Sequence, residues 1–576
     1  MLDMYPVNDK KTALAYDHFP TTMQAVIWRN WDMVPVKRIS RALRTDERQI
    51  LELAEQMGLP VPPEVNPLWL SRGYITIIRA NWHLLPYEQL LELLGWSESQ
   101  LAFTLKEDDF LWIKLGGFKP ATETVHYRPL TNEEIERTNE LRQRIAGQFS
   151  AMATENDNLT SREEKPFGFL THFRQAVSAV PPIFATPEAE EIVVNESWTI
   201  VYPDALANCR FFVERFMDRH ARRWGVRLNS QTDERETDGS FTIRLQVIPD
   251  NSVLAESHDI DIAPQAIAIR AVDEPGLLRG LQWLAREMER RNGPHLPVGR
   301  IRNKTKIDLR YIYSYFGVYG DPLIDPALDP YPDELLERLS DLGINGVWLQ
   351  NVLYNLIPWE EAPELSEGWE TRLAGLRKLT ERAARYGIGI YLYYNEPRAM
   401  PQSFFDKWPE WRDHEEAGLY ALCTSQPAIQ RYLKDSTARL FREVPGLAGL
   451  FTITMSENLS NCYSRSPSGK TSCPRCSLRP RAEVIAEVNR CIAEGAFSAK
   501  PDARIICWTW GWNPGWNWSA EEMERAISLL PAGVSVLSVS EDRLPTLVAG
   551  VAGEVSDYSM SNVGPSESSR LRWAAA

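Results

Sequence analysis

This sequence has few cysteines, fewer basic than acidic residues, and no long apolar runs. Seven cysteines in 576 residues are few, and the odd number suits free thiols in a reducing compartment better than a disulfide framework. No apolar run reaches the roughly 18–20 residues that span a bilayer, so we expect no membrane segment. The net charge of −15 argues against a general binder of nucleic acid or anionic membranes. Because the first twenty residues also lack the apolar centre of a secretory signal, we expect a cytoplasmic protein.

Tryptophan is the residue in excess, with 20 copies. Many of these rings must pack in cores, but the flat apolar ring of tryptophan also matches the C–H face of a pyranose. The chain is too long for a single core, so we expect several domains. The tryptophan excess is therefore compatible with a protein that binds carbohydrate.

Residues 1–125 contain an internal repeat with a period of 51 residues. Asn30-Trp31-Asp32-Met33-Val34-Pro35 recurs as Asn81-Trp82-His83-Leu84-Leu85-Pro86. Apolar residues recur at matching helical offsets after each proline, so each unit is predicted to be helix, turn, helix. A DNA-reading helix-turn-helix pair is the functional alternative, but Lys106-Glu107-Asp108-Asp109 makes the last predicted helix acidic, and phosphates would repel it. We therefore expect an all-α packing module that binds no nucleic acid.

Two regions of different character follow the repeat. Residues 126–190 form a polar, proline-containing linker with one or two helices, and residues 191–303 are typical of a small α/β domain. The predicted strands of this domain are 198–202, 241–247 and 266–271, and its predicted helices are 205–224 and a segment that opens at Gly276. We expect a small sheet covered by helices.

Strand and helix patterns alternate regularly over residues 304–576. The predicted strands are 307–316, 346–352, 389–394, 450–455, 504–510, 534–539 and 555–560. Repeated βα units at this spacing predict an α/β fold with a (β/α)8 TIM-like barrel. Seven strands are found rather than eight, and a barrel open at one seam exposes apolar strand edges. We therefore expect that the sequence is truncated before an eighth βα unit.

The segment 449–458 carries the strongest indication of chemistry. The apolar, β-branched run from Leu450 to Met455 predicts a fully buried strand, and Ser456 and Glu457 follow it directly. In barrels of parallel strands, the chemistry lies where the strands end. Glu457 is therefore the first candidate for a proton donor.

Further acidic, amide and aromatic residues stand at the predicted ends of the barrel strands. Glycosidic bond cleavage needs one carboxylic acid that protonates the leaving oxygen, and another carboxylate that attacks the anomeric carbon or activates water. The catalytic candidates are Glu457, Glu396, Asp557 and Glu541. The candidates for sugar contacts are Tyr313, Tyr315, Asn351, Asn395, Asn458, Trp508, Trp510 and Trp512. Structural alternatives exist, because Glu396 can cap a loop or pair with Arg398, and the tyrosines can fill the barrel interior.

Three cysteines form a separate motif in the loop after the fourth predicted barrel strand. Cys462, Cys473 and Cys476 have the spacing Cys-x10-Cys-x2-Cys, and a Cys-x2-Cys in a Gly/Ser/Pro loop is a usual half of a structural zinc site. The fourth ligand is left open between Cys423 and His414, and free thiols are the alternative to zinc. A metal here would pin the loop that begins after Glu457, and we expect no cofactor for catalysis.

The order of a small α/β domain followed by a barrel resembles that of glycoside hydrolases, namely the β-N-acetylhexosaminidases of family 20 and the α-glucuronidases of family 67. The segments that resemble family 67 are Leu342-Gly-Ile-Asn-Gly-Val-Trp-Leu-Gln-Asn-Val352, Tyr386-Gly-Ile388, Pro445-Gly-Leu-Ala-Gly-Leu-Phe451 and Ser456-Glu457. This resemblance covers roughly residues 190–560, and it implies that Glu457 is the general acid.

The departures from both families concern the residues around that acid. Family 20 has an Asp that orients the acetamido group of its substrate, whereas Ser456 stands at that place here, which puts N-acetyl-assisted chemistry in doubt. Val536 stands about where the α-glucuronidases have an Asp, so Glu541 and Asp557 are stand-ins that we suggest for the base. The N-terminal repeat and the three-cysteine loop belong to neither pattern.

These patterns predict a glycoside hydrolase with Glu457 as general acid and Glu396 or Asp557 as nucleophile or base. The alternative is a non-catalytic saccharide-binding or sensing protein with a degenerate barrel, which the poor match for the base and the missing eighth strand favour. A helix-turn-helix regulator that senses sugars would need a basic face on residues 30–110, which the sequence lacks.

Overall fold

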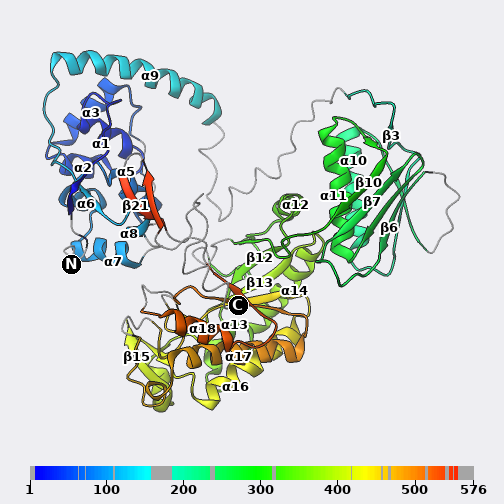
Figure 1. Cartoon of the computed structure of the whole chain (residues 1–576). Helices are drawn as coiled ribbons and strands as arrows, with labels where there is room; N and C mark the ends of the chain where they lie inside the picture. Colours follow the sequence, from blue (N-terminus) through cyan, green and yellow to red (C-terminus); the bar gives the residue numbers. More distant parts are fainter. Residues whose placement is uncertain are drawn as a thin grey trace. The chain divides into compact units, whose positions relative to one another are not determined.

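The computed structural model forms two compact units, Met1–Glu163 with Val539–Arg570 and Glu164–Ser538 with Leu571–Ala576 (Figure 1). The structure describes residues 5, 7–62, 64–65, 67–71, 73–107, 111–156, 184–233, 241–313, 320–416, 418–455, 458–464, 469–512, 517–538, 544–548 and 551–555. Within these ranges, every helix is too short or too polar to traverse a bilayer.

The first unit consists of short helices around one apolar core. Its helices are α1 (Thr22–Asn30), α2 (Val36–Ala42), α3 (Glu47–Met57), α4 (Pro67–Ser71), α5 (Tyr74–Asn81), α6 (Tyr87–Leu94), α7 (Glu98–Glu107), α8 (Leu111–Lys114) and α9 (Asn132–Asn156). Its strands are β1 (Val7–Thr12), β2 (Lys119–Ala121), β20 (Leu544–Val548) and β21 (Val551–Val555). The pairing of β1 with β2 in parallel corrects the expectation of an all-α module.

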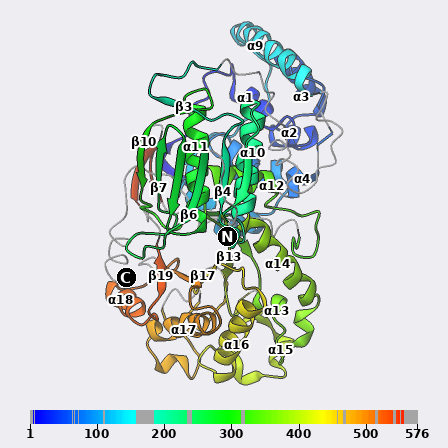
Figure 2. The same cartoon turned by 90° about the vertical axis from the view of Figure 1, so that its right-hand side faces the viewer.

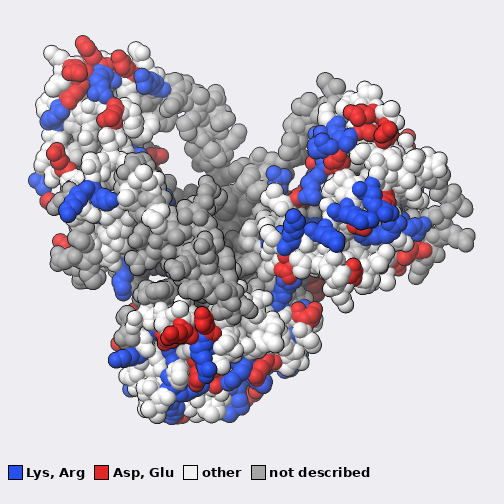
Figure 3. Space-filling model, in the orientation of Figure 1, with Lys and Arg blue, Asp and Glu red and all other residues white. Residues whose placement is uncertain are grey.

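The repeated asparagines meet in the core of this unit. Asn30 donates a hydrogen bond to Asn81 (2.9 Å) and accepts one from it (2.8 Å), and both side chains are fully buried. Each also donates to the carbonyl four residues earlier in its own helix, at 2.8 Å. The two copies therefore contact each other through equivalent residues. On the face drawn in Figure 3, acidic side chains accompany the basic ones of this unit.

The second unit begins with a six-stranded mixed sheet in the order β10-β7-β8-β6-β4-β5. The strands of the sheet are β4 (Thr199–Tyr202), β5 (Asn229–Thr232), β6 (Thr242–Val247), β7 (His258–Ala263), β8 (Ala266–Ala271) and β10 (Gly299–Asn303). This part of the unit also contains β3 (Glu191–Val193) and β9 (His295–Pro297), which pair with each other, and the helices α10 (Cys209–Trp224) and α11 (Glu274–Arg290). Apolar residues alternate along β6 and β8, so one face of the sheet is buried, and α10 and α11 pack beside it (Figure 2).

The rest of the unit is a curled sheet of six parallel strands, which lie in chain order β11-β12-β13-β17-β18-β19. The strands are β11 (Tyr311–Tyr313), β12 (Gly346–Gln350), β13 (Gly389–Tyr394), β17 (Gly449–Ile453), β18 (Arg504–Trp508) and β19 (Val534–Leu537). The helices are α12 (Asp333–Asp341), α13 (Leu353–Leu356), α14 (Trp369–Ala384), α16 (Pro427–Glu443), α17 (Arg481–Ala499) and α18 (Ala520–Ser528). Sequential parallel pairing through helical crossovers is the arrangement of half a TIM barrel.

A smaller sheet is inserted between β13 and α16. It is formed by β14 (Met400–Pro401), β16 (Leu419–Leu422) and β15 (Arg412–Glu416), in that order, with the short helix α15 (Gln402–Phe405). The described residues of this unit also include the 3-10 turns η3 (Pro363–Ser366), η4 (Pro409–Trp411) and η5 (Cys476–Leu478).

Only Val555 of the seventh predicted barrel strand, 555–560, lies within the described residues. Val555 ends β21, which pairs antiparallel with β20, and Lys11 donates a hydrogen bond to the carbonyl of Ala552 (3.3 Å). A short apolar run predicts an extended segment but does not specify the strand with which it pairs. Residues 556–560 lie outside the described ranges, and the missing eighth unit stays a prediction.

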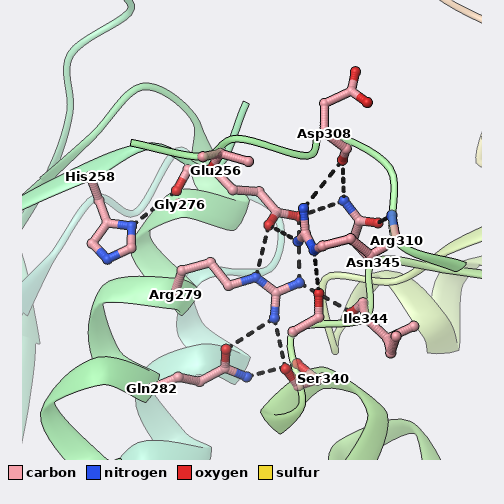
Figure 4. Close-up of polar contacts among 12 residues, drawn as sticks. Glu256, His258, Gly276, Arg279, Gln282, Asp308, Arg310, Ser340, Ile344 and Asn345 are labelled. Atoms are coloured by element: carbon pink, nitrogen blue, oxygen red, sulfur yellow. Dashed lines mark hydrogen bonds and ion pairs between the residues drawn. The ribbon is translucent and has the colours of Figure 1, made fainter. Parts of the chain in front are cut away.

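A buried ion pair joins the small α/β part to the parallel sheet (Figure 4). The Arg279 guanidinium on α11 contacts Glu256 (3.0 Å) and donates to the carbonyl of Ser340 at the end of α12 (2.8 Å). Glu256 also contacts Arg310, just before β11, and accepts a hydrogen bond from Asn345, just before β12 (3.0 Å). One carboxylate therefore fixes the amino ends of two parallel strands.

Candidate active site

The two faces of the parallel sheet have different chemistry. Alternate residues such as Val347, Ile390 and Leu450 belong to the core that includes buried residues of α14, α16 and α17. Figure 2 shows α13, α16 and α17 gathered on one side of the strands. The residues between them, such as Trp348, Tyr391 and Phe451, form a second cluster on the opposite face. This opposite face, which we call the inner face, is mostly aromatic.

Tyr391 fills the amino-terminal part of the inner face. A methyl group at Gly346 or Gly449, on the two neighbouring strands, would lie 2.9 or 3.0 Å from the Tyr391 ring, so glycine is needed at both places. Tyr391 stacks on Tyr311, with ring centroids 6.0 Å apart, and burial raises the pKa of each hydroxyl to about 12. Neither tyrosine serves as an acid or base near neutral pH.

Partly exposed aromatic rings stand near the carboxyl-terminal ends of the strands. Trp508 and Trp510 lie edge to face, with centroids 5.0 Å apart, and Trp508 also contacts Phe451 on β17 (6.1 Å). On β13, the Tyr393 ring lies 5.2 Å from both Trp348 and Phe451. These contacts place Trp508 and Trp510, both predicted from the sequence as sugar-contacting residues, together at the inner face.

Amide side chains follow the same strand ends. Asn395 is buried and donates a hydrogen bond to the Tyr393 hydroxyl (3.1 Å), which attaches it to the aromatic group. Asn351 is half-buried beyond β12, where its side chain accepts a hydrogen bond from the N–H of Val352 (2.7 Å), and Asn458 is half-buried beyond β17. Tyr393 and Trp348 were missed as candidates, although the alternation within β12 and β13 would have placed them on one face with Tyr391.

Trp512 is not a sugar-contacting ring. It is fully buried and stacks on Trp518, with centroids 5.4 Å apart and the planes 14° from parallel. Both rings belong to an apolar cluster with Met455 and Cys507. Five tryptophans within eleven residues suggested several surface rings, but the turn after β18 directs this one into the core.

Glu396 lies on the helix-facing side of the sheet rather than on the inner face. Its carboxylate accepts a hydrogen bond from the N–H of Leu353 at the start of α13 (2.7 Å), and only 1% of the residue is exposed. The neighbouring Tyr394 hydroxyl bonds with Thr437 on α16 (3.0 Å), which places this part of β13 against the helices. Burial raises the pKa of Glu396 to about 7, partly offset by Arg398. These contacts favour the capping alternative for Glu396.

We predict that Glu396→Gln changes the pH dependence of stability and leaves turnover intact. Folding raises the pKa from its ordinary 4.5 to about 7, so the folded state holds the proton more tightly, and stability is lost as pH rises from 4.5 through 7. The loss is at most about 3 kcal/mol, at 1.36 kcal/mol per pKa unit. The variant should therefore gain stability relative to the native chain between pH 5 and pH 8, as measured by urea titration. A hundredfold fall in turnover would instead return Glu396 to the catalytic candidates.

Several sequence-based candidates lie outside the part of the chain that the structure describes in full. Glu457, Glu541, Asp557 and Tyr315 are outside the described ranges, and Tyr313 is described only as part of the β11 backbone. Their roles stay predictions. The described residues nearest Glu457 along the chain are Met455, which is buried, and Asn458.

The cysteine motif is brought together with a fourth thiol. The sulfurs of Cys462, Cys473, Cys476 and Cys423 all lie within 4.8 Å of one another, and all four residues are buried. His414, the other candidate for the fourth ligand, is directed to Asp413 through its Nδ1 (3.2 Å).

Comparisons with known proteins identify solved glycoside hydrolases as structural neighbours. The superposed structures include a GH138 enzyme targeting pectin rhamnogalacturonan II (13% identity, TM-score 0.44), the Flavobacterium johnsoniae chitobiase of GH20 (16%, 0.41) and the GH20 β-N-acetylhexosaminidase from Streptomyces coelicolor A3(2) (14%, 0.39). They cover 61%, 62% and 63% of this chain, and the matched part spans 50%, 58% and 69% of theirs. No family model and no curated protein matches the sequence.

Glycoside hydrolases, family 20 among them, are found as neighbours, as expected. The closer likeness to family 67 stays a prediction.

Proposed function

We propose that this protein is a glycoside hydrolase whose sugar-binding surface is the inner face of the parallel sheet, at the carboxyl-terminal ends of its strands. The observation that carries the proposal is the pairing of partly exposed Trp508 and Trp510 next to Phe451 on β17, the strand that leads toward Glu457. Aromatic rings bind the apolar face of a pyranose, and an amide such as that of the half-buried Asn458 would bind its hydroxyls.

Glu457 is our choice for the general acid. It lies four residues beyond Ile453, the last residue of β17, in the strand-end position where barrel enzymes carry their catalytic groups. A protonated carboxyl group there would donate to the leaving oxygen, and a second carboxylate would attack the anomeric carbon or activate water. Because Glu396 caps α13, it is not our choice for that second group. Ser456 supplies no carboxylate to orient an acetamido group, so a substrate-assisted mechanism is not part of the proposal.

Binding at the two tryptophans tests the proposed surface. We expect Trp510→Ala to weaken binding of the preferred sugar fivefold to thirtyfold, because losing a stacked ring costs about 1–2 kcal/mol. Titration of intrinsic fluorescence or calorimetry would measure the change. Trp283→Ala is the matched control, since Trp283 is a partly exposed ring on α11. Equal affinity of Trp510→Ala and the native chain would remove the inner face from the proposal.

A non-catalytic saccharide-binding protein is the second candidate. The observation in its favour is that the inner-face side chains described just beyond β13 and β18 are an amide, Asn395, and an aromatic ring, Trp510, while the carboxylate described beside them, Glu396, is directed to the helices. On this alternative, the tryptophan variants would lose binding as above, but the native chain would hydrolyse no glycoside.

A further inference from the structure

We propose that Cys423, Cys462, Cys473 and Cys476 bind one structural zinc ion. The four sulfurs all lie within 4.8 Å of one another, and Cys423 lies 3.5 Å from Cys473 and 3.8 Å from Cys476, sulfur to sulfur. A tetrahedral zinc–thiolate centre with Zn–S distances of about 2.3 Å requires sulfurs about 3.8 Å apart. Two of the six separations therefore lie near the edge length of such a tetrahedron, and none exceeds it by more than about 1 Å.

The local chain conformation at Cys473 and Cys476 is that of a metal-binding turn. The N–H of Cys476 is directed to the sulfur of Cys473 (3.5 Å), and the N–H of Ser477 bonds to the Cys473 carbonyl (2.9 Å), so Pro474 and Arg475 form a tight turn between the two thiols. Backbone N–H groups that bond to sulfur stabilise thiolate over thiol. The turn continues directly into η5.

The Ser425 hydroxyl is a further hydrogen-bond donor next to the cluster. Arg479 donates a hydrogen bond to the Ser425 hydroxyl oxygen (2.6 Å), and that hydroxyl lies 3.2 Å from the Cys476 sulfur. Because the Ser425 oxygen already accepts from the guanidinium, its own proton is available to the sulfur. Outer partners of this kind orient metal ligands and balance the negative charge of four thiolates.

The position of the cluster explains what the metal would do. Cys423 comes directly after β16 of the inserted sheet, whereas the other three cysteines lie in the long connection between β17 and α17. In the described residues of that connection the only regular element is η5, and long loops with little structure of their own need another source of order. Zinc would fasten this connection, which begins next to Glu457, to the inserted sheet.

Three other states of four adjacent cysteines are chemically reasonable. They can remain reduced without metal, or close into disulfides, and a tetrahedral set of four sulfurs also suits iron. Zinc is favoured over free thiols and disulfides because all four residues are at most 2% exposed, no two of the sulfurs are more than 4.8 Å apart, and structural zinc sites of this kind leave no position open.

Metal analysis of the purified chain decides between these states. We expect one zinc per native chain by plasma mass spectrometry, the same content in Cys491→Ser, and less than a tenth of it in Cys423→Ser and Cys476→Ser. Cys491 is the matched control because it is a buried thiol on α17 outside the cluster. Native chain without zinc, with iron instead, or with the cluster oxidised to disulfides would overturn the proposal.

If the serine variants fail to fold, the absorption spectrum of bound cobalt still tests the metal site. Native chain refolded with Co2+ should show the intense visible bands of a tetrahedral all-sulfur site, and Cys423→His, which retains a metal donor, should bind cobalt with bands shifted to shorter wavelength. Unchanged bands in Cys423→His would exclude Cys423 as the fourth ligand. Both measurements detect the bound metal directly, so their outcomes do not depend on the proposed hydrolase activity.

Discussion

Glu457→Gln is expected to lower the turnover of an alkyl glycoside by about 10²–10⁴-fold, the usual contribution of a general acid. The amide cannot transfer a proton to the leaving oxygen, whereas the sugar contacts at Trp508 and Trp510 are retained, so KM should change little. The loss should be much smaller for a dinitrophenyl glycoside, because that leaving group departs without protonation. Steady-state kinetics on the two substrates measure both effects.

Glu494→Gln is the control for this substitution. Glu494 is a half-exposed residue of α17 that pairs with Lys434, so its replacement should leave both rates within twofold of native. Equal losses on the alkyl and dinitrophenyl substrates would show that Glu457 is not the proton donor. Unchanged turnover on both would remove it from the mechanism altogether.

Glu256→Gln is expected to destabilise the second unit by about 3–5 kcal/mol, the cost of leaving a buried partner charge uncompensated. The Arg279 and Glu256 side chains are only 8% and 7% exposed, and Arg310 and Asn345 contact the same carboxylate. The amide keeps the shape of the side chain but not its charge. Urea unfolding followed by circular dichroism should show the fall in the free energy of unfolding.

The matched control for Glu256 is Glu214→Gln. Glu214 pairs with Arg210 on α10 at a similar distance, 2.8 Å, but the two side chains are 49% and 73% exposed, so the substitution should cost less than about 1 kcal/mol. Equal destabilisation by the two substitutions would mean that the Glu256 cluster does not hold the strand ends in place.

The sequence was sufficient for those parts of the fold that depend on local pattern. The apolar, β-branched runs of β12, β13, β17 and β18 were located to within a few residues, because strands buried on both faces read as continuous hydrophobic segments. The regular spacing of the helices between them indicated parallel pairing. Pairing partners are not encoded locally, which is why the sequence did not show that Val555 ends the hairpin strand β21 rather than beginning a barrel strand.

The candidate site was harder to derive, because a strand end fixes where a side chain starts but not which face it occupies. Asn395 and Glu396 are adjacent, yet one bonds with the inner-face Tyr393 and the other caps α13, since successive residues point to opposite sides. The cysteine motif predicted three ligands by spacing and left the fourth open between Cys423 and His414, because no local spacing relates either residue to the motif. The fold brings the Cys423 sulfur within 4.8 Å of the other three.

The central claim is that this protein hydrolyses glycosides at the inner face of its parallel sheet. It is tested most directly by incubating the native chain with a panel of nitrophenyl glycosides that includes uronic-acid and N-acetyl sugars, and measuring release of nitrophenol. The account predicts hydrolysis of at least one sugar by the native chain, with weaker binding of that sugar in Trp510→Ala and loss of turnover in Glu457→Gln. Sugar binding at the tryptophans without release of nitrophenol from any glycoside would contradict it.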